Sequence, residues 1–227
     1  MLSQAKGVLF DLDGTLLDTA KDLGACLNYL MDKYGFEHVS YEQYRLVASD
    51  GVYPLLDLGF AEQLVHFDRE QLRQEFLDYY LENIAVHSKP FDGIVELIDA
   101  IERQNVPWGV VTNKPAFLTD PLMLQYPEFK QSIINVSGDT LPQRKPDPAP
   151  MLLASEALGV ASKDIWYFGD AERDIQAGRR ADMTTVIAKW GYIKNEQELA
   201  SWQANYCVAH PLHILAVEDQ AKDRPNL

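Results

Sequence analysis

The 227-residue sequence has few basic residues for its length. Lys and Arg number 20 against 34 Asp and Glu, and the resulting net charge of −14 argues against a surface that binds nucleic acid. Exposed charges are screened beyond about 8 Å at physiological ionic strength, so a small phosphorylated ligand depends on the local site instead. The charge balance therefore excludes a polyanion partner but not a small phosphorylated substrate.

Cysteine and long apolar runs are scarce as well. Cys26 and Cys207 lie far apart inside apolar segments, so we expect both to be buried and reduced and to form no metal site. No apolar run approaches the roughly 18 residues of a membrane span, and Lys6 and Asp11 interrupt the N-terminal stretch. We expect a cytoplasmic protein without a signal peptide or membrane contact, and the sequence indicates no protein partner.

From residue 88 onward, short apolar segments alternate with helical patterns. This alternation predicts an α/β protein with a doubly wound parallel sheet and helices on both faces. The expected strands are 8–10, 107–112, 133–136, 165–168, 184–188 and 206–209, and the expected helices are 94–104, 116–124, 151–158, 172–181 and 196–203. The proline-rich segment 141–150 is expected to be an irregular loop, and 216–227 a loose tail.

Roughly 70 residues of helical pattern separate the first expected strand from the second, much more than a usual crossover. We expect helices at 23–34, 41–48, 53–60 and 67–86 in an inserted helical cap. The predicted division is a core of residues 1–18 and 89–227 and a cap of residues 19–88, with hinges at 16–19 and 89–93. The aromatic residues expected to pack inside the cap are Tyr29, Tyr34, Phe76, Tyr79 and Tyr80.

Polar residues follow several of the expected strands at the point where each strand ends. Asp11 and Asp13 follow the first strand, Thr112 and Asn113 end the second, and Asp170 follows the fourth. In open α/β sheets, ligands bind at the carboxyl ends of the strands, so these residues are candidates for chemistry. Taken alone, the Asp-x-Asp-Gly turn is nearly as well explained as a solvated surface turn.

Asp170 and Asp174 are four residues apart at the start of a helix and share one face of it. Two carboxylates about 4 Å apart repel by about 4 kcal/mol at an effective dielectric constant near 20, and Asp11 would add to this repulsion. A divalent cation removes the repulsion, and hard oxygen ligands suit Mg²⁺. Asp174 considered singly is better explained as an acidic residue in a first helical turn.

The same residues suit phosphoryl transfer. An aspartate can act as a nucleophile and form an acyl-phosphate, and a second acid two residues later can protonate the leaving group and then activate water. Donors must also hold the phosphate oxygens, and the candidates are Thr112, Asn113, Lys145 and the backbone amide of Leu12. Without the acids, Lys145 would be an ordinary exposed loop lysine.

Four motifs in this order resemble the haloacid dehalogenase superfamily, and specifically its phosphatases with a helical cap inserted after the first strand. The motifs are DLDGTLLDT, VVTNK, RKPDP and FGDAERDIQAG, and the resemblance covers residues 7 to about 215. It implies a Rossmann-like core of the haloacid dehalogenase type and an Mg²⁺-dependent phosphoric monoester hydrolase that works through an aspartyl-phosphate.

The resemblance also implies roles for individual residues. Asp11 would be the nucleophile and a metal ligand, and Asp13 the general acid and base whose backbone carbonyl binds the metal. Thr112 and Asn113 would donate to the phosphate, and Lys145 would position phosphate and nucleophile. Asp170 and Asp174 would complete the metal site.

Within the superfamily the chain resembles phosphoglycolate phosphatases and the related phosphatases of N-acetylmuramic acid 6-phosphate. In both groups a cap loop reaches the substrate, and here we expect Ser49, Asp50 and Gly51 to select it. Asp50 would repel a carboxylate such as that of glycolate, although it also suits a turn before Gly51. A sugar phosphomutase of the same architecture remains an alternative, and a dehalogenase or an inactive phosphoester-binding protein is less well supported.

Overall fold

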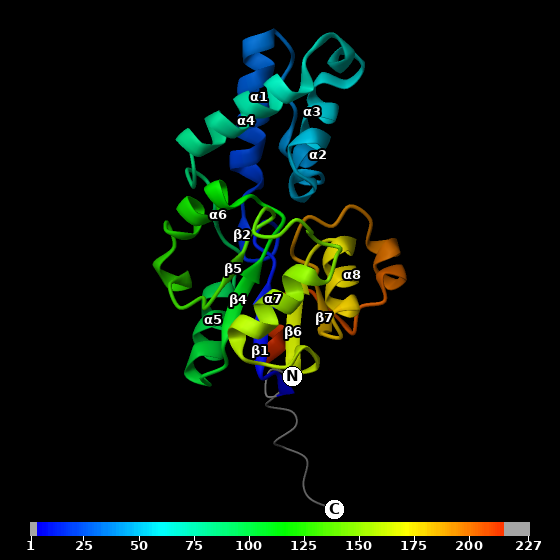
Figure 1. The fold of residues 1–227 in the computed structure, drawn as a ribbon. Helices are drawn as coiled ribbons and strands as arrows, with labels where there is room; N and C mark the ends of the chain where they lie inside the picture. Colours follow the sequence, from blue (N-terminus) through cyan, green and yellow to red (C-terminus); the bar gives the residue numbers. More distant parts are fainter. Residues whose placement is uncertain (1–3, 216–227) are drawn as a thin grey trace, which may run out of the picture.

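The computed structural model describes residues 4–215, which form a sheet-containing core below a helical cap (Figure 1). The core sheet has six strands, and every neighbouring pair in it is parallel. Their order is β5 (Asn135–Val136), β4 (Trp108–Val111), β1 (Gly7–Phe10), β6 (Ile165–Gly169), β7 (Thr184–Ala188) and β8 (Tyr206–Val208). The predicted doubly wound parallel sheet is confirmed.

Both faces of the sheet are covered by helices, which explains why its strands read as continuous apolar runs. On one face, Phe10 packs with residues of α5 (Ile94–Arg103) and α6 (Ala116–Met123). On the other face, Leu9 packs with residues of α7 (Ala149–Leu158) and α8 (Glu172–Arg180). The central strands β1 and β6 are buried along their whole length. Their carboxyl ends therefore lie at fixed positions beneath the cap.

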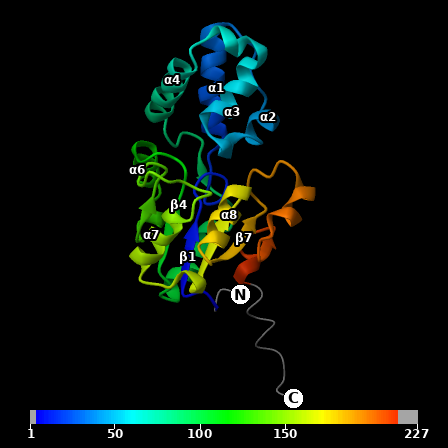
Figure 2. The ribbon, with the colours of Figure 1, turned by 45° about the vertical axis from the view of Figure 1, so that its right-hand side comes forward.

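The cap consists of α1 (Ala20–Tyr34), α2 (Tyr41–Arg45), α3 (Val52–Phe60) and α4 (Arg69–Glu82), with short 3₁₀ turns at Ala48–Asp50 and Ala61–His66 (Figures 1 and 2). Helix α1 ends at Gly35, whose positive φ of 75° lets its N–H bond back to the carbonyls of Asp32 and Met31. The cap has an apolar core of its own. All described buried members of this core lie within residues 20–80 except Leu118 and Tyr192.

The two chain segments between core and cap form a small antiparallel ribbon. Strand β2 (Leu17–Asp18) pairs with β3 (Lys89–Pro90), and the N–H of Phe91 donates to the carbonyl of Leu16. The sequence predicted hinges here without predicting that they pair. Pairing makes the outgoing and returning segments one connection instead of two independent linkers.

Several local predictions were wrong. Helix α2 stops at Arg45 and not at residue 48. Helix α4 spans Arg69–Glu82 and not 67–86, and it begins late because the Asp68 side chain caps it by accepting from the N–H groups of Glu70 and Gln71. Helix α7 begins at Ala149, inside the expected irregular loop, since proline fits the first helical turn. Cys207 is exposed on β8, whereas Cys26 is buried as expected.

Other differences are smaller. Strand β5 covers only the second half of 133–136, and the expected helix at 196–203 is a 3₁₀ helix over Glu196–Trp202. The predicted tail at 216–227 lies outside the described residues. Across residues 4–215, none of the helices combines the length and the apolar character that crossing a bilayer requires.

Phe60 tests the packing of the cap. Its side chain is 1% exposed, and its ring centroid lies 5.8, 5.2 and 5.0 Å from those of Tyr34, Phe36 and Phe67. We expect Phe60→Ala to lower the free energy of unfolding by about 3–5 kcal/mol, measured by urea denaturation, because it leaves a cavity among these rings. Val65→Ala, at an 81% exposed position, is the control. Equal unfolding midpoints for the two variants would contradict this description of the cap.

Candidate active site

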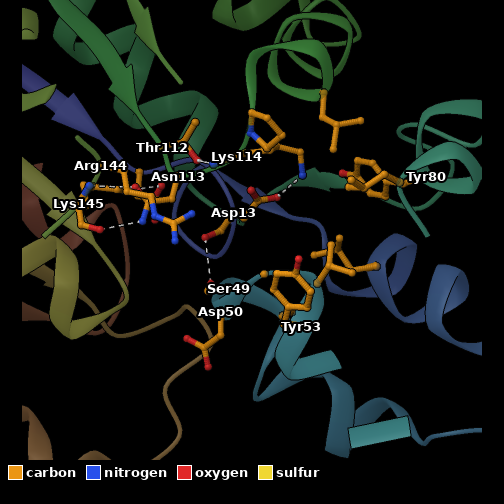
Figure 3. A pocket seen from close by; sticks show the side chains of 18 of the residues that line it. Asp13, Ser49, Asp50, Tyr53, Tyr80, Thr112, Asn113, Lys114, Arg144 and Lys145 are labelled. Carbon is orange, nitrogen blue, oxygen red and sulfur yellow. Dashed lines mark hydrogen bonds and ion pairs between the residues drawn. The ribbon is translucent and has the colours of Figure 1, made fainter. Parts of the chain in front are cut away.

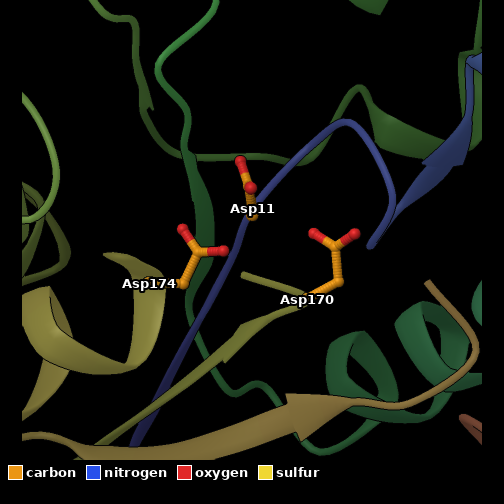
Figure 4. A group of neighbouring side chains, drawn as sticks. All are labelled: Asp11, Asp170 and Asp174. Atoms are coloured by element: carbon orange, nitrogen blue, oxygen red, sulfur yellow. The ribbon is translucent and has the colours of Figure 1, made fainter. Parts of the chain in front are cut away.

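Three buried carboxylates meet at the carboxyl ends of the central strands (Figure 4). Asp11 follows β1, Asp170 follows β6, and Asp174 lies in the first turn of α8. They are 3%, 3% and 0% exposed, and each offers an oxygen within 4.8 Å of the others. The structure thus brings together three acids separated by up to 163 positions in the sequence.

Lys145 is the ammonium group at the centre of this cluster. Its Nζ lies 2.9 Å from Asp11 Oδ1 and 2.8 Å from Asp174 Oδ1. It also donates to the Val111 carbonyl at 2.8 Å and to the Tyr167 hydroxyl at 2.9 Å. Lys145 is 2% exposed, so the alternative of an ordinary loop lysine is ruled out.

One ammonium does not balance three buried carboxylates. Burial and the nearby Asp174 raise the pKa of Asp11 to about 6, and burial together with Asp11 raises the pKa of Asp170 to about 7. Burial also acts to raise the pKa of Asp174, but Lys145 and Arg173 hold it below its ordinary value. Among residues 4–215, no lysine or arginine lies within ion-pair distance of Asp170. This set of hard oxygen donors, short of positive charge, fits a divalent cation.

The close approach of the chain to Asp170 depends on Gly14. Its φ is 83°, and a Cβ placed there would lie 2.1 Å from Asp170 Oδ2. Glycine is the residue that tolerates both the positive φ and this contact. The glycine of the Asp-x-Asp-Gly sequence therefore has a steric role within the cluster and not only a role in a turn.

Asp13 lies beside the cluster, and its carboxylate contacts Thr19 and Lys114 instead of the other acids. Its Oδ1 accepts from Thr19 Oγ1 at 2.6 Å and from Lys114 Nζ at 3.0 Å, while its Oδ2 has no hydrogen-bond partner among the described residues. Burial alone would lower the pKa of Lys114, but the Asp13 carboxylate raises it. Lys114 is the last residue of the VVTNK motif, but its contact with Asp13 could not be predicted from the motif.

The expected phosphate donors occupy the same end of the sheet. Thr112 is 4% exposed and its Oγ1 accepts from the N–H of Lys114 at 3.1 Å, while the N–H of Leu12 donates to Asp11 Oδ1 at 2.7 Å. The Asn113 side chain exchanges two hydrogen bonds with the backbone of Lys145. The Asn113 side chain thus holds the loop that carries Lys145 in place. The backbone N–H of Asn113 is then the donor left for a ligand.

A cavity of about 590 Å³ opens above these residues, between core and cap (Figure 3). Asp13, Thr112 and Lys145 of the core lie on one side, and Tyr53 and Tyr80 of the cap lie on the other, while Asp11 also lines the cavity. Phe76 and Tyr80, expected only in the cap core, belong both to that core and to the cavity wall. All eight site residues predicted from the sequence in the core motifs converge at this end of the sheet, with Leu12, Asp170 and Asp174 just behind the wall.

The expected specificity loop is held against the core. The Asp50 carboxylate is paired with both Arg173 of α8 and Lys194, and Arg173 also donates to the Ser49 carbonyl. The Ser49 hydroxyl lies 3.2 Å from the Asp13 carbonyl and 3.2 Å from Asp170 Oδ2. Because two cations offset the charge of Asp50, this residue is not expected to repel an acidic substrate.

Tyr192 connects the acidic cluster to the hinge. Its N–H donates to Asp170 Oδ2 at 2.9 Å, and its hydroxyl donates to Asp18 Oδ1 while accepting from the N–H of Ala20. This role could not be predicted from the sequence pattern, because it depends on a residue beyond β7 meeting strand β2, 174 positions earlier in the chain. The only signal was the Trp-Gly-Tyr sequence at 190–192.

Comparison with known proteins agrees with this geometry. The family model described as haloacid dehalogenase-like hydrolase matches residues 8–188, from the first strand of the sheet to the end of β7. The chain belongs to this family. The match covers the cap and all of the acidic residues discussed above.

Relatives in the family are similar over nearly their whole length. An N-acetylmuramic acid 6-phosphate phosphatase from Pseudomonas aeruginosa is 42% identical over 216 residues, covering 95% of this chain and 96% of the relative. A phosphoglycolate phosphatase from Xanthomonas campestris is 39% identical over 209 residues, covering 91% and 93%. The crystal structure of a predicted phosphoglycolate phosphatase from Haemophilus somnus has a TM-score of 0.84 at 24% identity, covering 96% of this chain and 100% of that chain.

Asp170→Asn tests the charge imbalance. Since the folded pKa of about 7 lies above the ordinary value of 3.8, the ionised carboxyl costs stability at pH 8, and this cost disappears as the pH falls toward 4. We expect the variant to be more stable than the unmodified protein at pH 8 in EDTA, by up to about 4 kcal/mol, and equally stable near pH 4.

Thermal unfolding with and without Mg²⁺ provides the second half of this test. If a divalent cation binds among these carboxylates, Mg²⁺ should raise the Tm of the unmodified protein at pH 8 and raise that of Asp170→Asn much less, because the substitution removes one of the three carboxylates. A variant that is no more stable than the unmodified protein in EDTA at pH 8 would show that the cluster is not short of positive charge.

Proposed function

We propose that the protein is an Mg²⁺-dependent phosphatase that hydrolyses a small phosphate monoester through an aspartyl-phosphate on Asp11. The observation that carries this proposal is the position of Asp11, buried among two further acids and one lysine at the floor of a cavity. The names of the relatives support the same activity, since both describe phosphatases of small phosphorylated acids.

In this proposal Asp11 attacks phosphorus with one carboxylate oxygen while the bond to the leaving alcohol breaks. Lys145, at 2.9 Å from Asp11 Oδ1, fixes the direction of attack and offsets charge on the phosphate oxygens. Thr112 and the backbone amides of Leu12 and Asn113 supply further donors. Water then attacks the phosphorus and the bond to Asp11 breaks, which frees phosphate and restores the carboxylate.

Asp13 is the proton carrier of the proposal. Thr19 and Lys114 hold its Oδ1, so its Oδ2 is the oxygen available to the leaving group. It would give a proton to the departing alkoxide and later take one from the attacking water. One residue can serve both steps because the alcohol leaves and the water arrives on the same side of the phosphate. Thr19 is adjacent to the hinge strand β2, so movement of the cap and the position of Asp13 are linked.

Asp11, Asp170, Asp174 and the backbone carbonyl of Asp13 would hold the Mg²⁺ ion. When bound, the ion supplies positive charge that offsets the carboxylates and the phosphate together. The Ser49 hydroxyl, 3.2 Å from both the Asp13 carbonyl and Asp170, places the cap loop beside these ligands. We propose that residues 19–88 move as a cap about the β2–β3 ribbon and exclude water while the aspartyl-phosphate forms.

Asp11→Asn tests the nucleophile. Because an amide cannot form the acyl-phosphate, we expect phosphate release from p-nitrophenyl phosphate in Mg²⁺ to fall roughly 10³-fold or more. Asp164→Asn is the matched control, since Asp164 pairs with Lys6 at the opposite end of the sheet. Full activity in Asp11→Asn would refute the mechanism. A sugar phosphomutase would instead isomerise a sugar phosphate with little phosphate release.

Asp50→Asn tests the closed position of the cap. The substitution removes the charge that pairs with Arg173 and Lys194, so we expect a larger radius of gyration by X-ray scattering and a severalfold higher KM for small phosphate esters. Asp57→Asn is the control, because Asp57 pairs with Arg69 inside the cap. If both variants scatter and bind like the unmodified protein, the Asp50 pairs do not hold the cap closed.

A further inference from the structure

The cavity above Asp11 has more room and more positive charge than a phosphate group needs. Its volume of about 590 Å³ lies within the range of roughly 300–1,000 Å³ that is typical of pockets for drug-sized ligands. In a chain with a net charge of −14, the wall has more basic than acidic side chains. The basic residues are Arg73, Lys114, Arg144, Lys145 and Arg173, and the acidic residues are Asp11, Asp13 and Asp50.

Three of the basic residues have carboxylate partners, and two have none. Lys114 pairs with Asp13, Lys145 with Asp11, and Arg173 with Asp50. The side chains of Arg73 and Arg144 form no ion pair with any residue between 4 and 215. Arg144 precedes the catalytic lysine and is exposed on the core, whereas Arg73 is half-buried on the cap. Arg73 is therefore the unpaired cation on the cap side of the cavity, across from the catalytic residues of the core.

One face of α4 forms that wall. Arg73, Phe76, Leu77 and Tyr80 line the cavity, and their spacing of three, four and seven residues places them on the same side of the helix. Phe76 and Leu77 make the middle of this face apolar. Its polar groups stand at the two ends, roughly 10 Å apart along the helix axis. We call these four residues the α4 wall.

The Tyr80 hydroxyl, at the end nearer to Asp13, has no hydrogen-bond partner among residues 4–215. The residue is 0% exposed, and its oxygen is the one buried side-chain oxygen or nitrogen in the described chain without a partner. The neighbouring Lys114 Nζ lies over the ring, 4.3 Å from its centroid, and bonds to Asp13 instead. Buried hydroxyls are nearly always paired, so an orphan on a cavity wall points to a ligand.

Arg73, like the Tyr80 hydroxyl, lacks a partner among the described residues, whereas Arg69 one turn earlier has one. Arg69 and Arg73 both stand over the Tyr53 ring, at 5.4 and 6.0 Å from its centroid. Arg69 is paired with Asp57 at 2.9 Å and does not line the cavity, whereas Arg73 lines it and has no acid. Guanidinium groups bind carboxylates in a planar, two-point arrangement, which makes a carboxylate the natural partner for Arg73.

We propose that the α4 wall binds the leaving group of the substrate, with Arg73 pairing with a carboxylate and the Tyr80 hydroxyl donating to an oxygen nearer the phosphate. This inference rests on the proposed phosphatase function and names its substrate class. The substrate is the phosphate ester of a carboxylated alcohol larger than two carbons, such as a sugar acid, whose apolar face lies on Phe76 and Leu77.

A matched pair of substrates tests Arg73. N-acetylmuramic acid 6-phosphate and N-acetylglucosamine 6-phosphate differ only in the carboxylated ether that the first one has. We expect the unmodified enzyme to prefer the acid, and Arg73→Gln to reduce the ratio of the two kcat/KM values by about 10- to 100-fold, the usual worth of a hydrogen-bonded charge. Arg69→Gln, the matched control, should keep the ratio.

The outcomes distinguish the role of Arg73 from the phosphatase function on which it rests. If both kcat/KM values fall together in Arg73→Gln, or if Arg69→Gln changes the ratio equally, Arg73 does not contact the carboxylate and the inference is overturned. A ratio near one in the unmodified enzyme overturns it as well. Absence of Mg²⁺-dependent hydrolysis of p-nitrophenyl phosphate would instead refute the phosphatase function, and calorimetric Kd values for the two sugar phosphates would still test Arg73.

Tyr80→Phe tests the other end of the wall. Because the hydroxyl has no protein partner, its removal should leave the Tm unchanged or raise it, while the KM for N-acetylmuramic acid 6-phosphate rises severalfold. Tyr79→Phe is the control, since Tyr79 stacks on Tyr29 with ring centroids 4.1 Å apart, away from the cavity. An unchanged KM in Tyr80→Phe, or a Tm that falls, would show that the hydroxyl serves the fold and not a ligand.

Discussion

Mutual repulsion among three buried carboxylates is the constraint on which the rest of this structure depends. Asp11, Asp170 and Asp174 lie within 4.8 Å of one another around a single ammonium, so the folded chain retains an electrostatic cost that a divalent cation and a phosphate site can use. Such a cluster is stable only on rigid supports. The buried strands β1 and β6 and the first turn of α8 provide them, and Gly14 provides the space.

The same cluster reaches the cap through Arg173. Burial acts to lower the pKa of its guanidinium, yet the charges of Asp174, Asp11 and Asp170 raise it, so the cluster attracts this cation from the core side. From the cap side it binds Asp50 and the Ser49 carbonyl. A change in the charge of the cluster therefore changes how strongly Arg173 attracts the cap loop. One side chain therefore lies between the charge of the acidic cluster and the cap loop.

Much of this could be predicted from the sequence, because short apolar segments and the residues that follow them are local signals. The strands and the convergence of Asp11, Lys145 and Asp174 followed from them. The missed features are long-range: the pairing of β2 with β3, and the contacts of Tyr192 with both Asp170 and the hinge. Cys207 was placed in the core because its neighbours are apolar, but β8 is an edge strand with one exposed face.

The charge that a ligand meets in the cavity could not be predicted from single residues, because it depends on which side chains pair with one another. Asp50 alone suggested a site that repels a carboxylate, but Arg173 and Lys194 offset its charge. Within residues 4–215, the cations of the cavity wall that form no ion pair are Arg73 and Arg144. Pairing can be seen only in three dimensions. An acidic chain can bind an anion strongly where its few cations face a cavity and its acids are already satisfied, and α4 presents Arg73 in that state while Arg69, four residues earlier, is neutralised by Asp57.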